Sequence, residues 1–219
     1  MSNNPDKTMK DLSDRSEENG KDLLLRSAAI ENEEVINETL PVLCRELGLQ
    51  NCNTEAPEGF AMYKNLNAVI VHACNRISND QELQMLIADY SISHTTSKGQ
   101  RSEANSYFFG RMHLSKKYPQ TYICKETIRE KLTELFAKRE TDFPEHKKFS
   151  DKFYVLTNDP SRLTALLRFA PMDELVNFPE LELEIQGNDC FYRCSHKPLS
   201  LEEAMQHVAL TKVLLRIFR

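Results

Sequence analysis

The sequence has no long hydrophobic run. None of its 219 residues belongs to an apolar stretch of the roughly 18–20 residues that would cross a bilayer. The start of the chain also lacks the hydrophobic region of a secretory signal, because its one apolar cluster, 23–25, is too short. We therefore expect a protein without a transmembrane segment, located in the cytoplasm.

An excess of positive charge is missing as well. The formal net charge is −5 at pH 7, whereas general nucleic-acid binding usually needs a basic face. The pairs Lys116-Lys117 and Lys147-Lys148 are typical of a solvated surface. The composition therefore argues against a nucleic-acid partner.

The common sequence signatures of catalysis are absent too. The sequence contains no phosphate-binding loop, dinucleotide fingerprint, zinc-protease helix or nucleophile elbow. Its six cysteines occur in a chain with no export signal, which favours free, partly buried thiols over a disulfide framework. We expect no cofactor and no bound metal.

What is present divides into a polar tail, a helix and one larger domain. Residues 1–20 are polar and lack apolar periodicity, which predicts a disordered tail. Residues 21–48 are predicted to contain an amphipathic helix, and residues 60–219 a single domain. The segment 50–59 between them is rich in turn-forming residues and is predicted to be a loop.

The N-terminal helix is predicted from apolar residues at spacings of three and four, namely Ile36, Leu40, Leu43 and Leu47. Gly48 stands where a left-handed C-terminal cap belongs. Pro41 predicts a kink or a helix restart near Thr39. The polar face of this helix is acidic, so docking on its own domain is favoured over binding to an anionic membrane.

The first part of the larger domain is predicted to form an antiparallel meander. Two β-rich runs, 68–74 and 83–92, flank the polar turn 75–82 in the manner of a β-hairpin. A polar loop at 94–104 then leads to a third strand at 106–114. Within that strand Gly110 is a candidate β-bulge. Tyr118-Pro119 is expected to break the chain before a short edge segment at 120–124.

The chain is organised around the aromatic segment 142–157. Phe143, Phe149 and Phe153 are predicted apolar anchors, and residues 153–156 are typical of a short strand. We interpret this segment as the hinge between two halves of one fold.

The remaining elements are helices and one more hairpin. Asp159-Pro160 and the Ser200–Glu203 pair are helix-start signals. Strands at 181–186 and 190–195 are predicted to flank a tight turn at 187–189, and helices are predicted at 127–138, 160–178 and 200–218. The predicted fold is α+β: an antiparallel sheet, made of a meander plus the C-terminal hairpin, is packed by three or four helices, with the N-terminal helix docked outside.

Three features carry a resemblance to a known family. A strand ends in Asp89-Tyr90 before a polar hairpin containing Lys98-Gly99, and a Pro-led segment at 118–122 precedes a helix at Thr127. The third and most specific feature is a run of Asp142-Phe143, His146-x-x-Phe149-Ser150, Tyr154 and the helix-opening Asp159.

Over residues 60–218 the chain thus resembles bacterial proteins that carry a domain of unknown function, often behind an N-terminal membrane anchor. The resemblance implies a bacterial protein of this fold class. The membrane-spanning segment of many members is missing from this sequence, so membrane attachment is not implied here. The family has no established activity or catalytic residues that could be transferred to this chain.

Two groups of cysteine and histidine residues are candidates for chemistry. Cys190, Cys194 and His196 fall on one strand face, but about 13 Å separates the two thiols of an extended strand, too far for one zinc ion. His72 and Cys74 could form a nucleophilic pair, although no orienting acid is identifiable. We favour packing of Cys74 as a small apolar residue with His72 at the sheet surface.

A third candidate lies in the central segment. It is a surface for a partner or ligand that comprises Asp142, His146, Lys147, Lys148 and Asp151. A titratable histidine between carboxylates could bind a partner or act in acid–base chemistry. In the alternative interpretation these residues cap a turn while the phenylalanines anchor it.

The sequence therefore favours a non-catalytic binding or scaffold module with an unidentified protein partner, through which it could associate peripherally with a membrane. The alternative is an enzyme of unknown class that uses the His146 region or the His72–Cys74 pair. A homo-oligomer joined through the N-terminal helix is a third hypothesis. A deep pocket lined by one of these histidines would favour the enzyme, and an apolar surface groove would favour the binding module.

Overall fold

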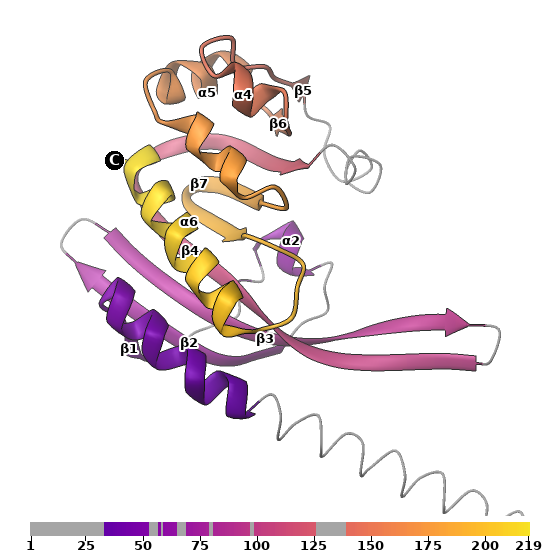
Figure 1. The fold of residues 1–219 in the computed structure, drawn as a ribbon. Helices are drawn as coiled ribbons and strands as arrows, with labels where there is room; N and C mark the ends of the chain where they lie inside the picture. Colours follow the sequence, from indigo (N-terminus) through magenta and orange to yellow (C-terminus); the bar gives the residue numbers. More distant parts are fainter. Residues whose placement is uncertain are drawn as a thin grey trace, which may run out of the picture.

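The strands that the structure describes form one antiparallel sheet. In this computed structural model the described residues are 33–52, 57, 59–64, 69–78, 81–96, 99–125 and 139–219. Within them the sheet has seven strands in the order β1-β2-β3-β4-β6-β5, and β7 pairs with β4 off this path. Helices pack against this sheet, so the predicted α+β fold is confirmed (Figure 1).

The bounds of the strands and helices are as follows. The strands are β1 (Gln50–Asn51), β2 (Val69–Ser78), β3 (Gln81–Thr96), β4 (Gly99–Lys125), β5 (Arg139–Glu140), β6 (Phe153–Thr157) and β7 (Glu182–Arg193). The helices are an N-terminal helix (33–47), α2 (Ala61–Lys64), α4 (Lys147–Ser150), α5 (Pro160–Leu167), the 3-10 helix η2 (Met172–Asn177) and α6 (Leu201–Ile217).

The sheet buries a different apolar cluster on each face. On β3, Leu83, Met85 and Ile87 face the larger cluster, while Leu86 and Ala88 face the smaller one, as the two-residue period of a strand requires. Residues of the N-terminal helix, α5, η2 and α6 complete the larger cluster. Phe60, Met62 and Tyr63, at and just before α2, contribute to the smaller one. The N-terminal helix and α6 accordingly cross the same face of the sheet (Figure 1).

Strands β2, β3 and β4 form the predicted meander, but they are longer than expected. The predicted loop at 94–104 is wrong, because β3 and β4 remain paired from Tyr90 opposite Asn105 to Thr96 opposite Gly99. β2 follows β3 only as far as Asp89, so this outer part is a two-stranded ribbon that projects from the body (Figure 1). The predicted turn at 75–82 is also too long, since β2 ends at Ser78 and β3 begins at Gln81.

β4 also runs through two predicted interruptions. The pairing of Gly110 with Met85 on β3 is regular, so the predicted bulge at Gly110 is wrong. The chain does not break at Tyr118-Pro119 either. The irregularity there is absorbed by shifts in register between β4 and β7 on both sides of Tyr118. The predicted edge segment 120–124 is instead the inner end of β4, where it lies between β6 and β7.

The predicted C-terminal hairpin is wrong. Residues 182–193 form the single strand β7, which pairs with β4 from Leu183 to Tyr192 with two shifts in register. Gly187 has a positive φ of 67°, and the Asn188 side chain donates a hydrogen bond to the Leu114 carbonyl at 2.9 Å. The turn-forming residues 187–189 therefore lie opposite the place where β4 bulges. Because β4 is paired with β7 on both sides of Gly187, the chain does not turn back there.

The N-terminal helix is part of the core. Leu43 is fully buried and belongs to the larger cluster, so the helix is not docked outside the domain. It continues without interruption through Pro41. The predicted cap is confirmed: Gly48 has a φ of 65°, and the Leu49 amide donates to the Cys44 carbonyl at 2.9 Å.

The phenylalanines of the aromatic segment 142–157 anchor it in the core, as predicted. Phe143, Phe149 and Phe153 are buried, and the Phe149 ring lies 5.7 Å from the Phe143 ring and 5.3 Å from the Phe153 ring. The predicted strand is β6. Asp159 caps α5 by accepting a hydrogen bond from the Arg162 amide at 3.1 Å.

The predicted helix at 160–178 is divided into α5 and η2. The tail at 1–20 and the helix at 127–138 lie outside the described residues.

Candidate functional site

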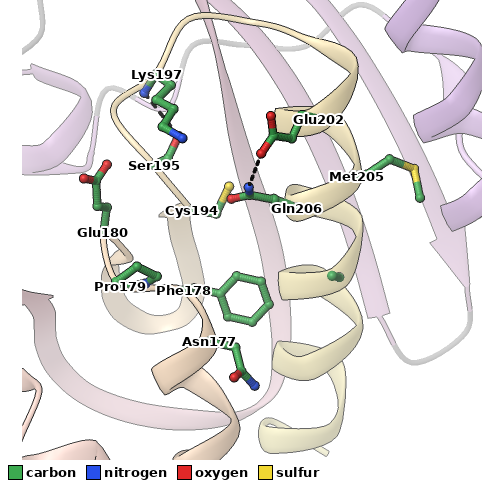
Figure 2. A pocket seen from close by; sticks show the side chains of 11 residues that line it. Asn177, Phe178, Pro179, Glu180, Cys194, Ser195, Lys197, Glu202, Met205 and Gln206 are labelled. Carbon is green, nitrogen blue, oxygen red and sulfur yellow. Dashed lines mark hydrogen bonds between the residues drawn. The ribbon is translucent and has the colours of Figure 1, made fainter.

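A surface groove separates α6 from the turn that follows η2. Its volume is about 520 Å³, which is within the usual range for ligand sites. Cys194 and Ser195, which directly follow β7, lie between the two walls of this groove (Figure 2). We call this hollow the α6 groove; it is lined by Asn177, Phe178, Pro179, Glu180, Cys194, Ser195, Lys197, Glu202, Met205, Gln206 and Ala209.

The local sequence fixes both walls of the groove. After β7 the chain turns away, and the Ser200 hydroxyl starts α6 by accepting a hydrogen bond from the Glu203 amide at 3.2 Å. A capping box has a second hydrogen bond, from the Ser200 amide to the Glu203 carboxylate, and the described contacts do not include it. The Glu203 carboxylate turns toward the end of β7, where it accepts a hydrogen bond from the Ser195 hydroxyl.

A thiol and an imidazole meet beneath the groove. The Cys194 Sγ lies 2.9 Å from Nδ1 of His207, and both residues are buried. The imidazole packs against the Phe108 ring, with a centroid separation of 5.4 Å. This contact joins the end of β7 to the buried face of α6.

Burial keeps both groups neutral. It raises the pKa of the Cys194 thiol well above its ordinary value, and the nearby Glu203 carboxylate adds to this effect. It lowers the pKa of His207 to about 3, with a further contribution from the positive charge of Arg193. A nucleophilic cysteine needs the thiolate, which positive charge or an exposed setting favours. The pair is therefore a neutral contact rather than an activated nucleophile.

The groove combines apolar walls with an acidic rim. Phe178, Pro179, Met205 and Ala209 supply apolar surface, and Met205 is 46% exposed. Glu180 and Glu202 lie on the rim with a single cation, Lys197, among the lining residues. The Lys197 ammonium is already 3.8 Å from the buried Glu203 carboxylate. The rim therefore keeps an excess of negative charge.

The five residues of the predicted surface around His146 have different surroundings. His146 Nε2 lies 3.1 Å from the carbonyl oxygens of both Leu167 and Arg168, so this nitrogen donates its proton to the end of α5. Lys147, Lys148 and Asp151 are exposed. Asp142 lines a separate hollow beside α5, whose lining residues do not include His146.

Contacts near this segment support the turn-capping interpretation. The Phe143 amide donates to the Ser150 hydroxyl at 2.8 Å, and the Phe149 amide donates to Asp173 at 3.0 Å. These side chains satisfy backbone groups around the phenylalanine anchors. A partner surface at Asp142, His146, Lys147, Lys148 and Asp151 stays a prediction.

His72 and Cys74 have different surroundings. His72 is exposed, whereas Cys74 is fully buried. The Cys74 Sγ lies 3.4 Å from the Cys44 Sγ on the N-terminal helix. Burial raises the pKa of Cys74 to about 12, and the hydrogen bond with Cys44 adds to this. These surroundings do not favour nucleophilic catalysis by the pair.

The residues Cys190, Cys194 and His196 have separate contacts. Cys194 contacts His207, while His196 Nε2 lies 3.1 Å from Oε1 of Glu182. Burial holds the pKa of the Cys190 thiol well above its ordinary value. Across the described ranges, no cluster of three or more histidine, cysteine, aspartate or glutamate side chains could hold a metal ion.

Sequence reasoning missed His207 and the second role of Glu203. His207 follows Cys194 by 13 positions, and its position in the helical pattern of α6 carries no sign that a thiol faces it. Glu203 was identified only as part of a helix-start signal. Because both contacts depend on how α6 crosses the end of β7, no local pattern could have revealed them.

Comparison with known proteins adds no relative. No protein-family model matches the chain, and no curated protein or solved structure matches it. The resemblance to the bacterial family with a domain of unknown function therefore stays a prediction. Within the described part of the chain, every helix is too short or too polar to span a membrane.

Proposed function

We propose that the protein is a non-catalytic binding module that takes an apolar, positively charged segment of a partner protein into the α6 groove. The observation that carries this proposal is the pairing of an exposed apolar wall with an acidic rim. A bacterial cytoplasmic location and a scaffold role remain predictions from the sequence.

The apolar wall supports a protein segment as the ligand. Met205 stands on the exposed side of α6, and its side chain projects away from Phe178, which lines the groove from the turn after η2 (Figure 2). Methionine side chains adapt their shape to apolar groups and recur at protein-binding surfaces. A hollow of about 520 Å³ has room for a few side chains of a partner.

The rim supports a positive charge on that segment. Glu180 and Glu202 flank the groove, and Lys197 is drawn toward Glu203. A lysine or arginine that enters beside Met205 would place its charge near these carboxylates and its aliphatic stem on the apolar wall. An acidic segment would instead meet charge of its own sign.

The chemistry beneath the groove supports binding over catalysis. A general base or nucleophile needs a pKa suited to proton transfer near neutral pH. The pKa of Cys194 is raised and that of His207 is lowered, both chiefly by burial. The alternative enzyme, which would use the His146 region or the His72–Cys74 pair, has less support because these side chains do not converge on a common cleft.

A peptide selection tests the proposal. A phage-displayed random peptide library is selected on the intact chain and on three variants. Met205→Gln removes the apolar side chain, and Glu202→Gln removes the rim charge. The matched control is Phe169→Gln, since Phe169 is 91% exposed and lies outside the groove.

The wild type and the control are expected to enrich the same peptides, which combine apolar residues with lysine or arginine. Met205→Gln is expected to weaken the binding of those peptides about tenfold. Glu202→Gln should weaken it about threefold at low salt and less at high salt. Enrichment of acidic peptides, or equal binding by all four proteins, would contradict the proposal.

A further inference from the structure

A thiol on the N-terminal helix faces a thiol on the central sheet. Cys44 Sγ lies 3.4 Å from Cys74 Sγ, although the two residues are 30 positions apart. Neither cysteine forms a disulfide in this structure. We propose that Cys44 and Cys74 form a reversible oxidation site, in which a peroxide converts the two thiols to a disulfide that locks the helix to β2.

The surrounding structure holds the two sulfur atoms in place. Leu43 and Leu47, on either side of Cys44, are buried in the larger cluster. The Leu49 amide donates to the Cys44 carbonyl, which caps the helix three residues after Cys44. A disulfide has an S–S length near 2.05 Å, so closure requires the sulfur atoms to approach by roughly 1.4 Å. Rotations of the two side chains can supply part of this movement.

The two cysteines differ in access. Cys44 is partly exposed and lines a surface hollow with Asn37, Leu40 and Pro41, whereas Cys74 is fully buried behind it. A small peroxide entering this hollow meets Cys44 first. Burial, which also raises the pKa of Cys74 to about 12, keeps the second thiol from direct attack on the oxidant. Cys44 is therefore the site of oxidation and Cys74 the resolving thiol.

The proposed reaction balances with hydrogen peroxide as the oxidant. The Cys44 thiol gives up its proton as its sulfur attacks one peroxide oxygen and the O–O bond breaks. The departing hydroxide takes that proton, so sulfenic acid and one water form. The sulfur of Cys74 then attacks the Cys44 sulfur, and the S–O bond breaks. The leaving hydroxide takes the proton of Cys74 and becomes water. Two thiols are thus oxidised to one disulfide, while one peroxide is reduced to two waters.

The disulfide would act on a helix that belongs to the core. It would close a chain segment of 30 positions, and such a link stabilises a protein mainly by restricting its unfolded chain. Through Glu46 the same helix also contacts Lys212 of α6, at 3.2 Å. Oxidation would therefore hold the helix on the sheet beside α6.

Peptide mapping of the intact, peroxide-treated protein tests this inference. The protein is treated with a small excess of hydrogen peroxide under native conditions, and its thiols are blocked before digestion without reductant. The expected product is one linked peptide pair, containing Cys44 and Cys74, whose mass is lower by two hydrogens. Treatment with dithiothreitol should separate the pair again.

Single substitutions distinguish the two roles. Cys44→Ser is expected to abolish the linked pair. Cys74→Ser should leave Cys44 as a sulfenic acid that dimedone traps. Because Cys74 is buried and its variant could misfold, Cys44→Ser, at the more exposed position, is the decisive substitution. The matched control is Cys124→Ser, which changes a buried thiol on β4 and should keep the linked pair.

Thermal unfolding gives a second measurement. The oxidised wild type should unfold about 5–10 °C above the reduced protein, and Cys44→Ser should show no such shift. Failure to form a linked pair, a link to Cys52 instead, or an oxidised protein with an unchanged Tm would each overturn the inference.

Discussion

Tyr192 on β7 packs its ring directly over Gly110 on β4. A Cβ atom built on Gly110 would lie 2.1 Å from Cζ of this ring, and the two residues are paired across the strands. The Tyr192 hydroxyl lies 2.8 Å from the Thr211 hydroxyl of α6, so the ring is held at both ends. The glycine therefore leaves room for a buried aromatic side chain that connects the sheet to α6.

Gly110→Ala is expected to lower the free energy of unfolding by about 3 kcal/mol or more, because the buried ring cannot move aside. The control is Gly59→Ala. The nearest atom to its added Cβ is 4.0 Å away, so its effect should stay within about 0.5 kcal/mol. Urea denaturation followed by circular dichroism measures both. Equal midpoints for the two variants would show that the Tyr192 ring yields readily.

Gly110 also shows what the sequence could and could not reveal. A glycine inside a strand predicts either a bulge or a close approach by another group, and the choice depends on β7, which is far away in the chain. The turn chemistry at 187–189 was misread for the same reason. Its residues suit a hairpin, and only the length of β4 makes them part of one continuous strand.

Signals within a few residues were reliable. Gly48, Asp159 and Ser200 end or begin their helices as predicted, because each cap depends on neighbouring backbone groups alone. The ribbon at the outer end of β3 and β4 was missed because its sequence is polar. A ribbon outside the core has no need for the apolar alternation that identifies a strand.

The candidate site could not be predicted for a related reason. The α6 groove brings together the turn after η2, the residues that follow β7 and one side of α6. The sequence pattern predicted that these helices and strands exist, but it did not predict how α6 lies against the other segments of the groove. Met205 and Glu202 look like ordinary helix surface in the sequence, and they become part of a site only because α6 lies beside the turn after η2.

A buried ion pair provides the second prediction. Arg193 donates two hydrogen bonds to Oε2 of Glu182, at 3.0 and 2.8 Å, and the two side chains are 6% and 4% exposed. Burial alone raises the pKa of Glu182, but its contacts with His196 and Arg193 outweigh this and hold the pKa below its usual value. The carboxylate is therefore charged at neutral pH.

Glu182→Gln should cost about 3–5 kcal/mol of stability, because it leaves a buried guanidinium without its counter-ion. The control is Glu145→Gln, which breaks the exposed pair of Glu145 and Arg168. Such surface pairs contribute only about 0–1 kcal/mol. Denaturation at pH 7 measures both changes, and a small effect at Glu182 would mean that water reaches Arg193.

The buried imidazole of His207 provides the third prediction. Its pKa is about 3 in the folded protein and 6.5 in an ordinary setting. Below about pH 6.5 the unfolded chain takes up a proton that the folded protein excludes. The stability associated with neutral His207 is therefore fully present above pH 6.5 and is lost as the pH falls toward 3.

This loss should reach about 1.4 kcal/mol per pH unit over the lower part of that range. His207→Gln removes the titrating group, so its stability should fall less steeply between pH 6.5 and 4.5. Denaturant midpoints across this range give the two slopes. If the slopes are equal, the folded protein must admit the proton to His207.

The most direct measurement of the proposed binding is the location of a bound peptide. A peptide enriched on the wild-type chain is titrated into ¹⁵N-labelled protein, and the amide shifts are followed by NMR. The largest saturable shifts are predicted at 177–180, 194–197 and 202–209, and Met205→Gln should reduce them. The proposal would be contradicted if the groove signals did not move and the largest shifts lay on the β3–β4 ribbon or at the start of β2, where Val69 and Val71 are exposed.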